Sequence, residues 1–155
     1  MARRIVKLVE EKLRPDLKTT LKLAIIGNVI DFSVGYDPAR LERDVEEMLK
    51  LPLYIDESEE LFQELKKAKT LLYLTDNVGE IHFDAIFLRR VREEFAVEIY
   101  IAGKEGPIIN DATVEDLRRA GLGELGMIIS TGTRIVGVPL GEVSEESEGS
   151  LRRPT

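Results

Sequence analysis

Between residues 70 and 130 the sequence alternates short apolar runs with longer amphipathic segments. Three runs have the length and composition of buried strands; they are "TLLYLT" (70–75), "VEIYIA" (97–102) and "GMIIS" (126–130). The two segments between them carry apolar residues at helical spacing; they are residues 80–95 and 113–122. Strands and helices that alternate at this pitch form a parallel sheet with right-handed crossovers, which leaves few folds open to the chain.

The first half of the chain has a helical pattern throughout. Apolar residues recur at helical spacing over 5–13 and, around much of the helix circumference, over 17–34. Asp37 is expected to cap a helix that begins at Pro38, and Asp56 to cap the next one. We therefore predict an α/β protein in which a helical N-terminal lobe precedes a doubly wound, Rossmann-like parallel sheet. The predicted units are 1–68 for the lobe, 69–140 for the α/β unit and 141–155 for a loose tail.

Composition excludes several classes of protein. The 155 residues carry a formal net charge of -7 and show no continuous basic face, which argues against a general nucleic-acid binder. The chain has no cysteine, so disulfides, thiolate metal sites and cysteine nucleophiles are excluded, and a reducing cytoplasmic location fits. The longest apolar run, 21–34, is interrupted by Lys22, Asn28 and Asp31, so it is too short and too polar to span a membrane.

Polar residues follow two of the predicted strands. Asp76 and Asn77 come directly after the first strand, and Asn110 and Asp111 stand in the loop that follows the second. In an open parallel sheet, ligands bind outside the carboxyl ends of the strands, where successive loops face one crevice. We therefore expect Asp76, Asn77 and Asp111 to converge at one edge of the sheet.

The expected donors are two carboxylates and an amide carbonyl. Hard oxygen donors, with neither cysteine nor clustered histidine, suit Mg²⁺ or Mn²⁺ better than zinc or copper. Gly79 and Gly106 would let the backbone approach a ligand closely, and the helix starts nearby would offer N–H groups to an anion. Lys104 lies in the second loop, where it would contact a phosphoryl oxygen. A cation together with a phosphate is the predicted ligand set.

Each of these residues also has a purely structural interpretation. Asp or Asn ahead of a helix is most common as an N-cap, and Asn28 and Asp31 can serve a helix kink or an interhelical hydrogen bond. Glu80 and Asp84 lie one helical turn apart and can both face the crevice, but the pattern favours a solvated helix face. The single histidine, His82, is expected to be partly buried and hydrogen-bonded rather than catalytic.

Four blocks of the sequence occur in an order and at intervals typical of one protein family. They are "IIGNVIDF" (25–32), "YLTDNVGEIHFD" (73–84), "GPIINDAT" (106–113) and "ISTGTRIVGVPL" (129–140). Together they resemble the DUF89 family of metal-dependent damage-control phosphatases, which includes the acidic residue methyltransferase 1-like proteins. The resemblance spans about residues 17–140, most of the chain.

The resemblance implies one divalent cation, Mg²⁺, Mn²⁺, Co²⁺ or Ni²⁺, at the carboxyl edge of a Rossmann-like sheet. By motif, Asp76, Asn77 and Asp111 match the metal ligands of the family, and Asn28 and Asp31 lie in the helix motif that faces the same cleft. The implied activity is hydrolysis of phosphate monoesters of small metabolites such as sugar phosphates. Asp76 is the candidate catalytic residue, and the choice between Asp76 and a metal-bound water as nucleophile stays open.

The sequence also departs from the family pattern. Relatives begin with further helices, and after the block that ends at Leu140 they continue through a helix and a strand to a lysine-glycine loop that contributes to phosphate binding. The polar stretch 141–155 does not resemble that helix, which predicts a truncated member. The alternative function is therefore a catalytically impaired fragment that binds a metal or a phosphate. An open sheet edge further predicts a homo-oligomer or a covering partner.

Overall fold

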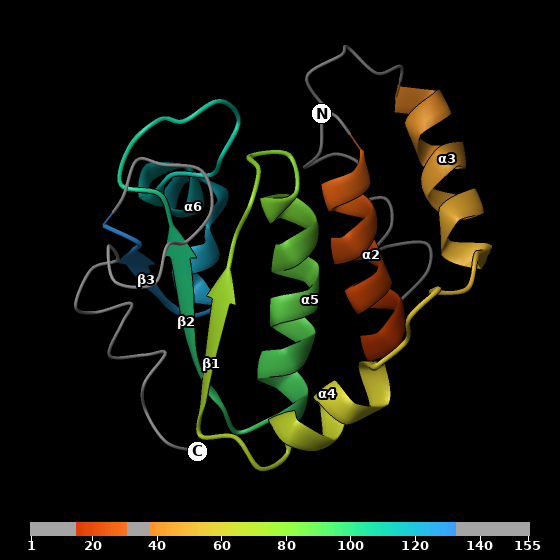
Figure 1. The fold of residues 1–155 in the computed structure, drawn as a ribbon, viewed down its shortest axis with the longest axis horizontal. Coiled ribbons are helices and arrows are strands. Elements are labelled where there is room, and N and C mark those ends of the chain that lie inside the picture. The colour runs from red at the N-terminus through yellow and green to blue at the C-terminus, as the bar shows by residue number, and fades with distance from the viewer. Residues whose placement is uncertain (1–14, 31–37, 133–155) are drawn as a thin grey trace.

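The computed structural model describes residues 15–30 and 38–132 as a mixed α/β fold (Figure 1). Five α-helices, one 3-10 helix and three strands lie in this part of the chain. In chain order they are α2 (Leu17–Val29), α3 (Pro38–Lys50), α4 (Ser58–Leu65), β1 (Thr70–Leu74), α5 (Ile81–Glu94), β2 (Glu98–Gly103), α6 (Val114–Ala120), η2 (Leu122–Glu124) and β3 (Met127–Ser130). The predicted fold class, helices followed by a parallel α/β sheet, is confirmed.

The three strands form one parallel sheet in the order β1-β2-β3. Thr70 of β1 lies opposite Glu98 at the start of β2, and Tyr100 of β2 lies opposite Met127 at the start of β3. Helices α5 and α6 make the two connections, and right-handed crossovers between strands in this order place both helices on one face of the sheet. The carboxyl ends of β1 and β2 therefore share one edge, which is uppermost in Figure 1.

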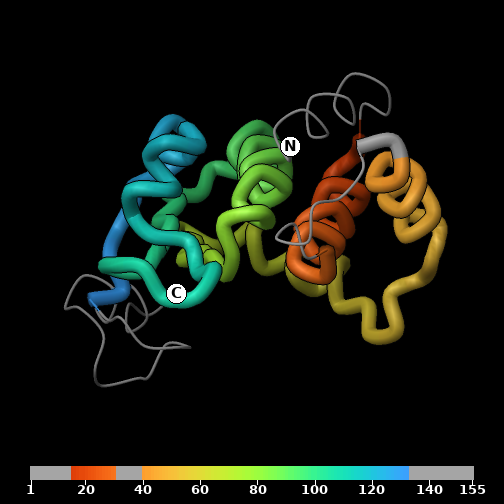
Figure 2. The backbone as a smooth tube through the Cα atoms, turned by 90° about the horizontal axis from the view of Figure 1, so that it is seen from above, coloured from red at the N-terminus to blue at the C-terminus, as the bar shows by residue number. Residues whose placement is uncertain are grey.

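Helix α5 packs on two sides, because it lies between the sheet and α2 (Figure 2). Its Leu88 and Val91 belong to the same buried cluster as Ile101 of β2, while its Phe83 and Ile86 belong to a second cluster with residues of α2 and α3. Burial of side chains of this size stabilises a fold by roughly 1.5–3 kcal/mol each. The N-terminal helices and the sheet are thus held together through α5.

Helix α2 is shorter than the sequence pattern predicts. It ends at Val29, because Ile30 is extended (φ -82°, ψ 115°), so the predicted continuation of this helix to residue 34 is wrong. Asp16 caps the other end, accepting a hydrogen bond of 2.8 Å from the backbone N–H of Thr19. No helix in the described ranges is long and apolar enough to cross a membrane. The helix predicted over 5–13 and the tail at 141–155 lie outside the described residues.

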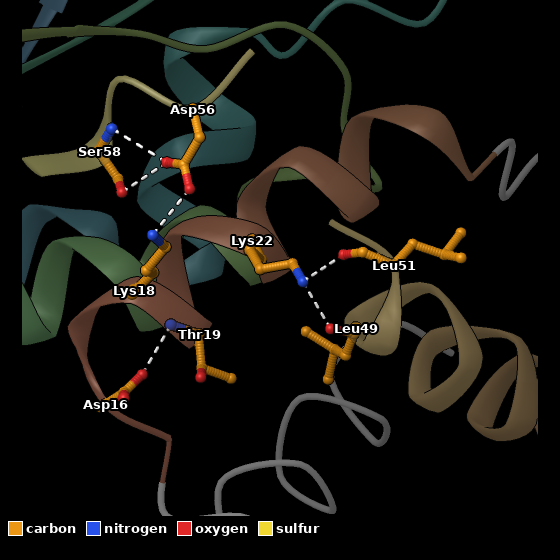
Figure 3. Close-up of polar contacts among 8 residues, drawn as sticks. All are labelled: Asp16, Lys18, Thr19, Lys22, Leu49, Leu51, Asp56 and Ser58. Carbon is orange, nitrogen blue, oxygen red and sulfur yellow. Dashed lines mark hydrogen bonds and ion pairs between the residues drawn. The ribbon is translucent and has the colours of Figure 1, made fainter. Parts of the chain in front are cut away.

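Two lysines of α2 form polar contacts with the end of α3 and with the residues just ahead of α4 (Figure 3). Lys22 donates hydrogen bonds of 2.5 and 2.6 Å to the backbone carbonyls of Leu49 and Leu51, at the carboxyl end of α3, where helix carbonyls otherwise lack partners. Lys18 lies 2.7 Å from Asp56, just ahead of α4, and this hydrogen bond is the largest contribution lowering the pKa of Asp56 to about 2. The ion pair between Lys18 and Asp56 is exposed to solvent, so it contributes little to the stability of the fold.

Gly27 lies at a close contact between α2 and α5. A Cβ at this position would lie 3.0 Å from the Cβ, Cγ and Cδ2 atoms of Phe83, which is fully buried. We expect Gly27→Ala to lower the free energy of unfolding by about 1 kcal/mol, because overpacking of roughly 1–3 kcal/mol exceeds the helix-propensity gain of about 1 kcal/mol. Urea denaturation of the purified variant measures this difference.

A matched control is Gly123→Ala, whose new Cβ would meet only Ile128 Cδ1, at an ordinary 3.5 Å. This variant is expected to unfold at the wild-type urea concentration or slightly above it. Equal stability of the two variants would contradict the close packing of α2 on α5.

Candidate functional site

The loops that follow β1 and β2 meet at the carboxyl edge of the sheet. The backbone N–H of Ala112 donates to the carbonyl of Asp76 at 2.6 Å, and that of Val78 donates to the carbonyl of Asn110 at 3.0 Å. Asn77 and Asp111 pair as a short antiparallel bridge between the loops. The structure therefore brings together the two loops that carry Asp76, Asn77 and Asp111, as parallel neighbouring strands require.

A third element reaches this edge, the last turn of α2. The Nδ2 atom of Asn28 donates to Asp76 Oδ2 at 2.8 Å and to Glu80 Oε2, also at 2.8 Å. The amide nitrogen carries two hydrogens, so one Asn28 side chain can serve both carboxylates. Asp31, the other candidate from this helix motif, lies outside the described residues. Of the two, Asn28 is the residue that the structure joins to the site.

Asn77 and Glu80 exchange hydrogen bonds between side chain and backbone in the turn ahead of α5. Asn77 Oδ1 accepts from the backbone N–H of Glu80 at 2.9 Å, and the backbone N–H of Asn77 lies 3.4 Å from Glu80 Oε2. Asn77 Nδ2 also lies 3.2 Å from the same Glu80 oxygen. The reciprocal bonds resemble a capping box, but the N-cap of α5 is Glu80, without a side-chain cap hydrogen bond, so Asn77 orders the turn ahead of the helix. A carbonyl oxygen has two lone pairs, so the hydrogen bond from the Glu80 backbone leaves Asn77 Oδ1 able to accept a second partner.

Glu80 and Asp84 are buried, so the prediction that they form a solvated helix face is wrong. Glu80 is 7% exposed and Asp84 is 0% exposed, because α2 and the sheet cover this side of α5. Burial raises the pKa of Glu80, although hydrogen bonds from Asn28 and Asn77 oppose the shift. A signal was present in the sequence, since Asp84 lies four and seven positions ahead of Leu88 and Val91, on the apolar stripe of the helix.

Asp84 pairs with a tyrosine beneath the site. Tyr73 of β1 donates its hydroxyl hydrogen to Asp84 Oδ1 at 2.7 Å, while Asp84 Oδ2 has no hydrogen-bond partner among the described residues. Burial raises the pKa of Asp84 well above its ordinary value, and the charge of Glu80 adds to the shift. Burial also raises the pKa of Tyr73. Both effects favour neutral side chains in this part of the core.

Lys104 is also buried, at 5% exposure, and lies against the second loop. Its Nζ is 3.8 Å from Asp111 Oδ2, and its backbone bonds with Ala112 and Val114 hold it beside the start of α6. A buried ammonium needs a negative partner, and Asp111 supplies it. A cleft of about 400 Å³ opens next to Asp111, between the loop over 105–111 and α6. The ion pair with Asp111 thus links Lys104 to the candidate site.

The donor set fits a hard divalent cation by its chemistry. Asp76 is exposed and Asp111 is half-buried, and together with the carbonyl oxygen of Asn77 they offer only oxygen ligands. No three histidine, cysteine, aspartate or glutamate side chains converge as a metal site in the part of the chain that the structure describes. The candidate set has only two such carboxylates and takes its third ligand from an amide, so it does not depend on a third acid.

Comparison with known proteins identifies the family. A family model described as the damage-control phosphatase ARMT1-like domain matches residues 1–152. The chain belongs to this family. The resemblance seen in the sequence is confirmed.

Individual relatives agree with the family assignment. A damage-control phosphatase from Pyrococcus horikoshii is 64% identical over 146 residues, which cover 94% of this chain and 51% of that protein. A damage-control phosphatase from Archaeoglobus fulgidus is 30% identical over 162 residues, covering 97% and 54%. A crystal structure of a DUF89 family protein from Pyrococcus horikoshii matches with a TM-score of 0.93 at 61% identity, covering 97% of this chain and 53% of that one. The chain spans about half the length of the relatives it matches.

The buried acid gives this ARMT1-like chain a testable pH dependence. Because the folded-state pKa of Asp84 is raised, its contribution to stability is complete below about pH 4, the unfolded-state pKa, and is lost as pH rises toward the folded-state pKa. Asp84→Asn keeps an oxygen for Tyr73 but cannot ionise. We expect the free energy of unfolding of the variant, relative to wild type, to rise by up to roughly 1 kcal/mol per pH unit across this window.

Urea denaturation at half-unit steps from pH 4.5 to pH 8 measures the effect. Glu80, whose pKa is also raised, titrates in both proteins, so the difference between them reports the ionisation of Asp84 together with its coupling to Glu80. Parallel pH profiles for the two proteins would contradict a neutral Asp84 in the core.

Proposed function

We propose that this chain carries the site of a metal-dependent phosphatase that hydrolyses phosphate monoesters of small metabolites such as sugar phosphates. The observation that supports it most is the joining of the β1 and β2 loops by the Ala112 to Asp76 hydrogen bond, with Asn28 attached to the same aspartate. Two carboxylates and an amide from these loops form an oxygen-only donor set beside a cleft. Family membership makes phosphoryl transfer the reaction that fits such a set.

In this proposal Asp76, Asn77 and Asp111 hold one divalent cation, Mg²⁺, Mn²⁺, Co²⁺ or Ni²⁺. When bound, the cation would act as a Lewis acid toward a phosphoryl oxygen. Asn28 donates to Asp76 Oδ2 and so fixes the orientation of that carboxylate. Lys104 balances the charge of Asp111 and is the candidate contact for a phosphoryl oxygen in the substrate complex.

Asp76 is the proposed catalytic residue because it is the exposed carboxylate of the set. It acts in one of two ways. Either its carboxylate attacks phosphorus, the alcohol leaves as the P–O ester bond breaks, and water then hydrolyses the aspartyl phosphate, or it orients a water molecule that attacks phosphorus as the same bond breaks. Asp111 is less suited to attack, since it is more buried and lies beside Lys104. Both aspartates would contact the cation, and the ammonium of Lys104 further lowers the nucleophilicity of Asp111, whereas Asp76 has the neutral amide of Asn28 instead.

A second function is favoured by the length of the match. The chain spans 51% of the Pyrococcus relative and 53% of the solved DUF89 chain, so residues outside this span are available to contribute to turnover there. The second candidate is therefore a module that binds a metal or a phosphorylated compound without hydrolysing it. Binding and turnover have to be measured separately to choose between the two.

We expect phosphate release from a panel of sugar phosphates to require an added divalent cation and to stop in EDTA. Asp76→Ala should lower the metal-stimulated rate by roughly 100-fold or more, because even supporting residues of metal sites contribute 10–100-fold. A malachite-green assay with Mg²⁺, Mn²⁺, Co²⁺ and Ni²⁺ measures the rates. Unchanged turnover in Asp76→Ala would remove the proposed site.

The control variant is Glu60→Ala, which removes an exposed acid on α4, at the opposite end of the sheet from both loops (Figure 1), and should keep the wild-type rate. Calorimetry with the same sugar phosphates and metals runs in parallel. Binding that is lost in Asp76→Ala, without any phosphate release from wild type, would select the binding module over the enzyme.

A further inference from the structure

We propose that Glu80 is a positioning residue of this site: its carboxylate fixes the side-chain amides of Asn28 and Asn77 and, through Asn28, the carboxylate of Asp76. The inference rests on the proposed metal site and adds to it a residue that the sequence pattern assigned to solvent. Glu80 touches none of the reacting groups in this scheme. Its role is to hold residues that do.

Three N–H groups converge on one oxygen of Glu80. Asn28 Nδ2 lies 2.8 Å from Glu80 Oε2, Asn77 Nδ2 lies 3.2 Å from it, and the backbone N of Asn77 lies 3.4 Å from it. A carboxylate can only accept, so it attracts the nitrogen end of each amide and repels the oxygen end. Glu80 therefore decides which way both amides point.

In Asn77, the orientation of the amide determines where Oδ1, a proposed metal ligand, lies. With Nδ2 turned toward Glu80 Oε2, Oδ1 lies on the other arm of the amide, where the backbone N–H of Glu80 reaches it at 2.9 Å. That hydrogen bond uses one lone pair and leaves the second. Without the acceptor at Glu80, the amide loses one of the contacts that distinguish its two ends.

For Asp76 the effect passes through Asn28. One Nδ2 atom serves both carboxylates at 2.8 Å, so an Asn28 side chain held by Glu80 also presents a hydrogen to Asp76 Oδ2 in a fixed direction. Asn28 comes from α2, whereas Asp76 and Glu80 lie in the loop that precedes α5. Through Asn28, Glu80 thus links the end of α2 by hydrogen bonds to the loop after β1 that carries Asp76.

The burial of Glu80 supports a fixed role. At 7% exposure the carboxylate has few competing contacts with water, so its hydrogen bonds to the two asparagines are not exchanged for solvent ones. Supporting residues of this kind hold metal ligands in many proteins, and their removal lowers metal affinity by roughly 10–100-fold.

Two variants separate positioning from charge and from direct ligation. Glu80→Gln can keep a carbonyl oxygen where Oε2 accepts the three N–H groups, while Glu80→Ala removes the acceptor. Two measurements are made on each: proton exchange of the Asn28 and Asn77 side-chain amides by NMR in metal-free protein, and Mn²⁺ affinity by calorimetry. Asp76→Asn serves as the ligand-loss reference and Glu60→Ala as the control.

We expect Glu80→Gln to keep slow amide exchange and a Mn²⁺ affinity close to that of wild type. Glu80→Ala should speed exchange at both asparagines and lower Mn²⁺ affinity by roughly 10–100-fold. If Glu80→Ala does not fold, the comparison of Glu80→Gln with Asp76→Asn still decides, since only the second should lose Mn²⁺.

Two results would overturn the inference. One is a loss of Mn²⁺ in Glu80→Gln as large as in Asp76→Asn, which would make Glu80 a ligand or a required charge. The other is unchanged amide exchange in a folded Glu80→Ala. Absence of Mn²⁺ binding by wild type would instead reject the proposed function, and the exchange data from metal-free protein would still decide whether Glu80 fixes the two amides.

Discussion

The close approach of α2 to α5 is the constraint on which the site depends. Gly27 lets α2 rest directly on Phe83, and the next residue, Asn28, is thereby carried to the start of α5. A side chain at 27 would press on Phe83 from 3.0 Å and push α2 away from α5, which would lengthen the 2.8 Å hydrogen bonds of Asn28. Packing between apolar surfaces, rather than attraction between polar groups, therefore sets where the polar groups meet.

The electrostatics of the site follow from that packing. Once α2 covers α5, Glu80 and Asp84 lose water, and both carboxyl pKa values rise. Glu80 recovers part of the lost solvation from amide N–H groups, whereas Asp84 receives one bond from Tyr73. The two acids lie one turn apart yet differ in their partners: hydrogen bonds from Asn28 and Asn77 offset part of the rise in the pKa of Glu80, whereas burial raises the pKa of Asp84 well above its ordinary value.

Sequence reasoning predicted the parallel sheet and the meeting of the two loops, because strand-helix alternation and strand ends are local patterns. It did not predict the burial of Glu80 or Asp84, which depends on how α2 packs on α5, a contact between segments more than fifty residues apart. The same contact decides that Asn28 reaches the site rather than bracing a helix kink. Lys104 differs again, since its burial depends on the fold of its own loop around Ala112 and Val114.

The chain spans about half the length of its relatives. This difference in length bears differently on cation binding and on turnover. All the proposed cation donors, and the residues that orient them, come from α2 and from the loops after β1 and β2, which lie within the described part of this chain. In the proposed scheme, a cation would find all of its protein ligands in these elements. The proposed substrate would need more, because a sugar phosphate presents a sugar as well as a phosphoryl group, and the cleft beside Asp111 is lined only by Val78, the loop over 105–111 and α6 with Thr113 ahead of it, among the described residues. Cation binding should thus depend less than turnover on whatever completes the longer relatives.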